Sequence, residues 1–171
     1  MRLKIINFKG GNLSMRSSIS DILDCMLYKE PFCVGEVDFG DDFITEKTIG
    51  DSNFGGKIGR AVIEIRADEG DNIPHFHIIS KSGNVSIAVR IDVAGYFDHP
   101  HAPNVFYNSK QTKVLDKFLR EPYKGKDSSK STSRWDEIVR FHNMSHPDAI
   151  ITVEEQPDYT KLVTNRKGRL K

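Results

Sequence analysis

The sequence predicts an α+β fold in which an antiparallel meander of strands, about residues 59–92, is packed on one face by helices. Three consecutive segments, 59–67, 74–80 and 84–92, alternate apolar and polar residues and are joined by short links, as antiparallel strands are. Segments with apolar residues at helical spacing precede and follow them. We therefore expect an N-terminal strand–helix unit, then the meander, then two helices.

The length of 171 residues predicts one domain, 1–171. Within this domain the pattern of apolar and polar residues changes at three places and defines four segments. They are a strand–helix unit with an irregular segment (1–56), a sheet with a histidine-rich loop (57–107), two helices (108–147), and a strand with a basic tail (148–171). Lys and Arg number 25 against 24 Asp and Glu, so the formal charge of +1 excludes a strongly basic surface over the whole molecule.

The sequence predicts a cytoplasmic protein without a membrane partner. No apolar run reaches the ~20 residues of a membrane span, and the N-terminus is too interrupted by polar residues for a signal peptide. Cys25 and Cys33 are the two cysteines, and their spacing matches no zinc motif. We expect both to be free thiols.

The first elements follow from periodicity and turn signals. Residues 2–8 are typical of a strand, and Ser18 with Asp21 can cap the helix that follows, which Pro31 stops. Segment 32–56 is either a hairpin or a long loop. The helix carries an apolar stripe that we expect in the core, formed by Ile19, Ile22, Leu23, Met26 and Leu27.

Two further helices flank a polar linker, residues 124–133. Asn108 or Ser109 can cap the first helix, and Ser133 can cap the second, which ends near His146. His142 falls on the buried stripe of the second helix, where a hydrogen-bonded structural histidine is the usual case. Residues 149–153 are typical of a last strand, and a basic tail follows.

The sequence predicts which residues of the three meander strands lie opposite one another. A hairpin at Ser82-Gly83 places Phe76 opposite Val89 and His75 opposite Arg90. This register keeps the apolar residues on one face, and a slip by one residue would mix the two faces. The second link brings Ile63 opposite Ile78. The other face then gathers Glu64, Arg66, His75, His77, Arg90 and Asp92.

This polar face has two interpretations. An antiparallel sheet with one solvated face alternates apolar and polar residues without any function. However, two histidines, two arginines and two carboxylates on neighbouring strands concentrate acid–base and anion-binding chemistry. We take His75 and His77 as candidate metal ligands, and Glu64, Arg66 and Arg90 as candidate catalytic residues.

A second histidine cluster follows the meander in "YFDHPHAP", residues 96–103. If this loop folds back over the polar face, His99 or His101 would complete three protein ligands and leave an open position for water. We take His99 as the third ligand of one divalent metal ion. The alternative is an ordinary surface turn.

Residues 63–90 resemble an uncharacterised family of small bacterial proteins whose signature is a strand, then Pro-Pro-His-Phe-His and a hydrophobic residue, then another strand. Residues 74–78, "PHFHI", match this signature. Ile73 replaces its first proline, and Asp71 stands where a further histidine is common. More loosely, 58–147 is similar to proteins carried by bacteria and their phages. The resemblance implies a toxin–antitoxin-like or mobile-element setting.

Three functions are compatible with these features. The first is a His-centred phosphodiester hydrolase acting on nucleic acid or a nucleotide, in which Arg66 and Arg90 steady the phosphate and Glu64 orients His77. The second is a non-enzymatic protein-binding module, an antitoxin or an inhibitor. The third is a sensor whose histidines bind only a ligand or a metal.

Overall fold

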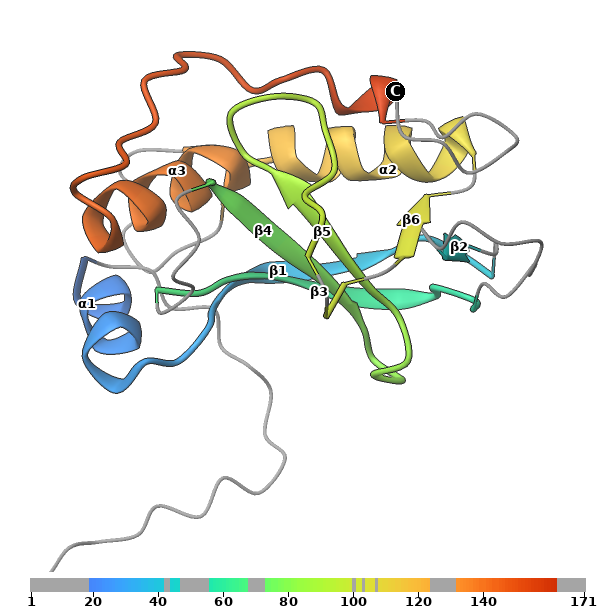
Figure 1. The fold of residues 1–171 in the computed structure, drawn as a ribbon, viewed down its shortest axis with the longest axis horizontal. Coiled ribbons are helices and arrows are strands. Elements are labelled where there is room, and N and C mark those ends of the chain that lie inside the picture. Colours follow the sequence, from blue (N-terminus) through green and yellow to red (C-terminus); the bar gives the residue numbers. More distant parts are fainter. Residues whose placement is uncertain are drawn as a thin grey trace, which may run out of the picture.

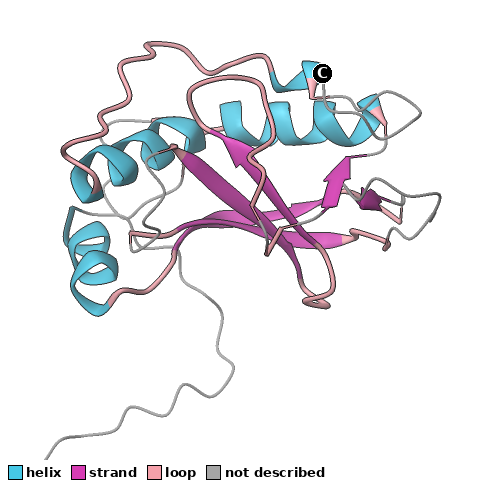
Figure 2. Ribbon diagram, viewed as in Figure 1, coloured by secondary structure: helices cyan, strands magenta, loops and turns pink. Residues whose placement is uncertain are grey.

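The computed structural model describes residues 19–41, 44–46, 56–67, 73–99, 101–102, 104–106, 108–123 and 132–162. The predicted α+β class is confirmed (Figures 1 and 2). The expected strand at 2–8, most of the linker and the basic tail lie outside the described residues. The elements in chain order are α1 (Ile19–Tyr28), β1 (Phe32–Asp38), β2 (Ile44–Glu46), β3 (Arg60–Ile65), β4 (His75–Ser80), β5 (Ser86–Arg90), β6 (Asn104–Phe106), α2 (Ser109–Arg120), α3 (Arg134–Ser145) and the 3-10 turn η1 (Tyr159–Lys161).

The main sheet is antiparallel and has the order β1-β3-β4-β5, while β2 and β6 form a separate pair. The predicted register of the meander is confirmed, because Phe76 lies opposite Val89, and His75 opposite Arg90. Glu64 lies opposite His77, as expected. Since side chains alternate along a strand, Phe76 points to one face of the sheet and both histidines point to the other.

Within segment 32–56, the described residues 32–41, 44–46 and 56 contain two strands that do not pair with each other, so they match neither a single hairpin nor a long loop. β1 pairs with β3 at the edge of the main sheet, and β2 pairs with β6. The β1 register is interrupted between Cys33 and Gly35. Gly35 has a φ of 139°, and a Cβ there would lie 3.1 Å from Cζ of Phe118. Glycine at this position therefore lets α2 pack closely on β1.

Helices α2 and α3 cover the apolar face of the sheet (Figure 1). Phe32 of β1 stacks on Phe141 of α3 with ring centroids 5.0 Å apart. The indole N–H of Trp135 donates to the carbonyl of Ile91 at 3.3 Å, just beyond β5. The core beneath the helices includes Ile63, Ile65, Phe76, Ile78, Ile87, Val89, Leu115, Phe118 and Ile138.

Both covering helices begin at the predicted caps. The Asn108 side chain accepts from the backbone N–H groups of Lys110 and Gln111, and a reciprocal bond completes a capping box. Ser133 and Asp136 form the same arrangement at the start of α3. These boxes satisfy donors that would otherwise be unpaired at a helix start.

Among the described residues, none of the helices combines the length and apolar character needed to cross a bilayer.

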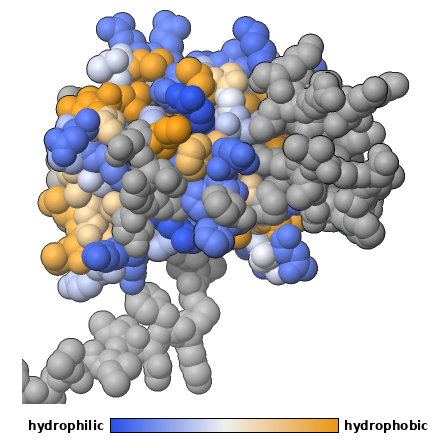
Figure 3. Space-filling view, viewed as in Figure 1, coloured by the Kyte–Doolittle hydropathy of each residue, from blue (hydrophilic) through white to orange (hydrophobic). Residues whose placement is uncertain are grey.

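Two expectations about the outer elements are wrong. In α1, Ile22 is buried, but Leu23 and Leu27 are 50% and 73% exposed, so the predicted stripe is only partly in the core. The helix lies beyond the end of the sheet (Figure 1). Ile22 reaches the core from it, while Leu23 and Leu27 do not. Apolar surface is visible at this end of the molecule in Figure 3. Residues 149–153 form no strand, because the backbone of Ile151 bonds to the Asn143 side chain instead.

Candidate metal centre

His75 and His77 project from the same face of β4 with ring centroids 5.0 Å apart. Strand alternation places them there, while Phe76 and Ile78 point into the core beneath the helices. Each histidine is only 5% exposed. This face is therefore not the solvated surface that alternation alone suggested.

The loop after β5 covers the two histidines. Tyr96 forms an isolated bridge with Val89, and the Phe97 N–H donates to the carbonyl of Ala88 at 3.0 Å, so the chain turns back along β5. The Phe97 ring then lies against His75, with centroids 4.2 Å apart. The fold-back that the sequence could only suggest is thus present.

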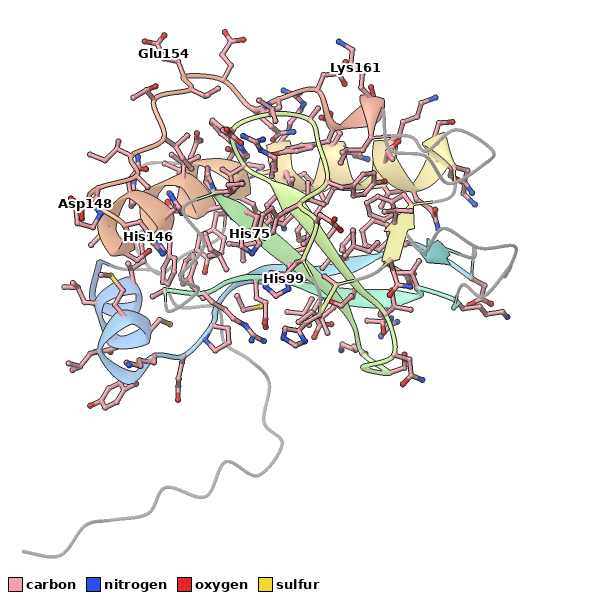
Figure 4. All side chains as sticks on the ribbon, viewed as in Figure 1. His75, His99, His146, Asp148, Glu154 and Lys161 are labelled. Atoms are coloured by element: carbon pink, nitrogen blue, oxygen red, sulfur yellow. The ribbon has the colours of Figure 1, made fainter. Side chains whose placement is uncertain are left out.

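This path brings His99 to the pair on β4. Its ring centroid lies 5.2 Å from that of His77 and 5.5 Å from that of His75. One nitrogen from each of the three rings lies within 4.8 Å of the others. Figure 4 shows His75 on β4 and His99 on the loop close to each other, below the helical layer. His101 is exposed and lies outside this group, 5.5 Å from His99.

Hydrogen bonds define the proton positions on two of these rings. Nδ1 of His75 donates to the Ile73 carbonyl at 2.9 Å, so its buried Nε2 carries the lone pair that a metal requires. Nδ1 of His99 accepts from the His101 N–H at 3.2 Å, which places the proton of a neutral ring on Nε2. Ligation through either nitrogen of the neutral His99 ring therefore ends the contact with His101. Nδ1 would either bind the metal itself or carry the proton while Nε2 binds it.

Of the three predicted charged residues, Glu64 and Arg90 lie opposite the histidines on neighbouring strands, and Arg66 is bound to Glu64. Glu64 accepts from Nε and Nη2 of Arg66 at 3.0 and 2.8 Å. Arg90, opposite His75, forms a two-point pair with Asp92, which raises the pKa of the guanidinium. The arginine side chains are 44% and 33% exposed, so both lie toward the solvent side of the centre.

Burial shifts the pKa values of two further titratable residues, Cys33 and His142, in opposite directions. Cys33 is opposite Glu64 in the β1–β3 register, and burial with the nearby carboxylates raises the pKa of its thiol. His142 is buried, and its Nε2 donates to the Ala149 carbonyl at 3.0 Å. Burial lowers the pKa of His142, as expected of a structural histidine.

Sequence reasoning missed Tyr96 and Phe97, which shape the covering loop. Both lie in residues 96–103, shortly before His99 and His101, but an aromatic pair beside a turn carries no specific signal. Their role depends on the path of the loop along β5, which the sequence pattern did not predict.

Three imidazoles from two separate segments form a ligand set that could hold a metal ion. Sets of three histidines occur in catalytic zinc sites. The described residues contain no other group of this kind. Comparison of the chain with protein-family models, with curated proteins and with solved structures finds no match.

Proposed function

We propose that the protein is a metal-dependent phosphodiester hydrolase acting on nucleic acid or a nucleotide, with one divalent ion held by His75, His77 and His99. The observation that carries this proposal is the approach of three imidazole nitrogens to within 4.8 Å of one another. Borderline cations such as Zn²⁺ bind neutral imidazole well, and three protein ligands leave a position for water. When bound, such an ion supplies a water of lowered pKa.

The surrounding side chains bind and orient the substrate in this proposal. Arg66 directly follows β3 and Arg90 ends β5, the two strands on either side of β4. Their guanidinium groups match the geometry of phosphate oxygens. Each arginine is already held by a carboxylate, so little side-chain entropy is lost on binding. Glu64 fixes Arg66 and lies beside His77 on the neighbouring strand.

Charge balance favours an anionic substrate. The two arginines are offset by Glu64 and Asp92, so the four side chains have no net charge. A bound divalent ion then leaves the centre with a charge of about +2 in a partly buried setting, where electrostatic attraction is stronger than in water. Phosphodiesters carry the complementary negative charge.

The test begins with metal content and ends with hydrolysis. Purified protein is analysed for metal, loaded with Zn²⁺ or Mn²⁺, and assayed with bis(p-nitrophenyl) phosphate and with mixed DNA and RNA oligonucleotides. We expect near-stoichiometric metal and hydrolysis that chelation abolishes, with both lost in His77→Ala. His146→Ala is the matched control, because His146 is half-buried but lies outside the cluster. Hydrolysis that persists in His77→Ala would refute the proposal.

A metal or ligand sensor is the second candidate, and the deep burial of two of the three histidines favours it. A sensor needs tight binding but no space for a substrate. It predicts stoichiometric metal without hydrolysis of any phosphodiester, and a measurable structural change when the metal is removed. The same assays therefore separate the two functions.

A protein-binding module is the third candidate, and α1 favours it. Leu23, Leu27 and Tyr28 are exposed on this one helix, and exposed apolar side chains that lie together often mark interaction sites. This function predicts a stoichiometric partner on purification from the native cell and loss of that partner in Leu27→Asp. The toxin–antitoxin-like or mobile-element setting, and the cytoplasmic location, remain proposals from the sequence.

A further inference from the structure

Tyr96 ties the histidine-bearing loop to two distant parts of the chain. Its hydroxyl donates to the carbonyl of Leu162 at 3.2 Å and accepts from the N–H of Phe106 at 3.0 Å. Burial raises the pKa of the phenol, so the hydroxyl keeps its proton and can donate at any physiological pH. One side chain thus joins the loop to β6 and to the segment after η1.

The backbone between Tyr96 and His99 is itself hydrogen-bonded. Tyr96 bridges Val89, Phe97 N–H donates to Ala88, and His99 N–H donates to the carbonyl of Phe97 at 3.0 Å. The Ala102 N–H then donates to the carbonyl of His99 at 3.0 Å. A displacement at Tyr96 would therefore be transmitted to the His99 ring.

The segment that contains η1 also contacts the end of β5, the strand that precedes the loop. The Tyr159 hydroxyl lies 2.9 Å from the carbonyl of Arg90 and 3.2 Å from that of Ile91, at the end of β5. On α2, Asp116 Oδ1 accepts from the N–H of Tyr159 at 3.0 Å, which joins η1 to the helical layer. Two tyrosine hydroxyls thus connect residues 159–162 with the strand and the loop that carry the site.

We infer that Tyr96 is a positioning residue for the candidate metal centre, which sets the place of His99 through the hydroxyl bridge between Leu162 and Phe106. This inference rests on the proposed metal site. Tyr96 itself contacts neither a metal nor a substrate in this arrangement. Tyr96 acts on the third ligand, His99. Through its bond to Leu162, it also makes the segment after η1 help to hold His99 in place.

The first experiment uses metal-free protein and therefore does not depend on the proposed function. Tyr96→Phe keeps the ring and removes only the hydroxyl. We expect the histidine Cε1–H NMR signals of His75 and His99 to shift, while the His146 signal stays in place. Tyr123→Phe is the control, since Tyr123 is a buried tyrosine that packs against Phe32 of β1, at the opposite edge of the sheet from β5. Unchanged His99 signals in Tyr96→Phe would overturn the inference.

The second experiment is a double-mutant cycle on Zn²⁺ affinity, measured by chelator competition. We expect Tyr96→Phe to weaken binding about tenfold, the lower range for loss of an outer-shell support. In the His99→Ala background the same change should have no effect, because its target is absent. An equal loss in both backgrounds, or no loss in either, would show that Tyr96 does not act through His99.

The two experiments also separate the inference from the proposal beneath it. If the unaltered protein binds no Zn²⁺, the proposed function fails, and the NMR comparison alone decides whether Tyr96 positions His99. If the protein binds Zn²⁺ and the cycle shows no coupling, the metal site stands and the inference about Tyr96 is wrong.

Discussion

His77 and His99 meet edge to face, with ring centroids 5.2 Å apart and an interplanar angle of 88°. One ring comes from the middle of β4 and the other from the loop that returns along β5. Because two separately held segments supply the ligands, the centre can lose one histidine without losing the strand that carries the other two. This property makes the contribution of His99 measurable by itself.

Removing His99 should weaken metal binding without unfolding the protein. The side chain is only half-buried, so His99→Ala leaves a small defect at the surface. We expect Zn²⁺ affinity to fall by on the order of 100-fold, at least as much as the loss of an outer-shell partner. Isothermal titration calorimetry gives the affinity. His101→Ala is the control, and an equal loss in that variant would contradict the assignment of His99 as the third ligand.

Metal binding should stabilise the folded protein. At a free Zn²⁺ concentration of 100 times Kd, the expected gain in the free energy of unfolding is about 2.7 kcal/mol. For a chain of this size that gain corresponds to a rise in Tm of about 5–10 °C. Differential scanning fluorimetry with and without a chelator measures it. The rise should be absent in His75→Ala, and a chelator-insensitive Tm in the unaltered protein would argue against the centre.

The two faces of the meander should respond differently to truncation. Phe76 is fully buried beneath the helices, so Phe76→Ala is expected to cost about 3–5 kcal/mol in the free energy of unfolding. Leu27 on α1 is largely exposed, and Leu27→Ala should change this free energy by no more than about 0.5 kcal/mol. Urea denaturation compares the two variants. Similar losses would mean that α1 is buried in solution.

His142 should make stability depend on pH. Burial lowers its pKa in the folded state below the ordinary 6.5, helped by His146 and His75, and opposed by the Ala149 carbonyl and Asp92. As pH falls below about 6.5, the unfolded chain binds a proton first, so the free energy of unfolding decreases until the folded pKa is reached. Above that window His142 contributes no pH dependence.

The measurement compares urea unfolding of the unaltered protein and of His142→Gln between pH 7.5 and 5. Glutamine can still donate to the Ala149 carbonyl but does not titrate in this range. The unaltered protein should lose more stability on acidification, by at most about 1.4 kcal/mol per pH unit. Parallel pH profiles for the two proteins would mean that His142 is not the group responsible.

Local chemistry explains which features could be predicted. The register of β4 and β5 followed from the position of Ser82-Gly83 and from the requirement that Phe76 and Ile78 share a face. The caps at Asn108 and Ser133 followed from short polar side chains before a periodic run. Such features depend on residues that are close in sequence, so an isolated segment contains the information.

The errors occurred where distant segments compete for the same surface. The stripe of α1 has correct helical spacing, yet the position of the helix beyond the sheet leaves Leu23 and Leu27 exposed. Residues 149–153 have strand-like composition, but the Asn143 side chain takes the hydrogen bonds of Ile151. Neither outcome is encoded in the segment itself.

The sequence alone determined that two imidazoles share one face of a strand, because backbone geometry imposes alternation on every strand. It also determined that a third histidine was available nearby in the chain. The sequence could not exclude His101 as the third residue, and only the tertiary structure places His99 beside the pair. The return of the loop along β5 and its hydrogen bonds through Tyr96 select which ring reaches the two histidines. Loop closure depends on contacts with β6 and with Leu162, which no local pattern near His99 contains.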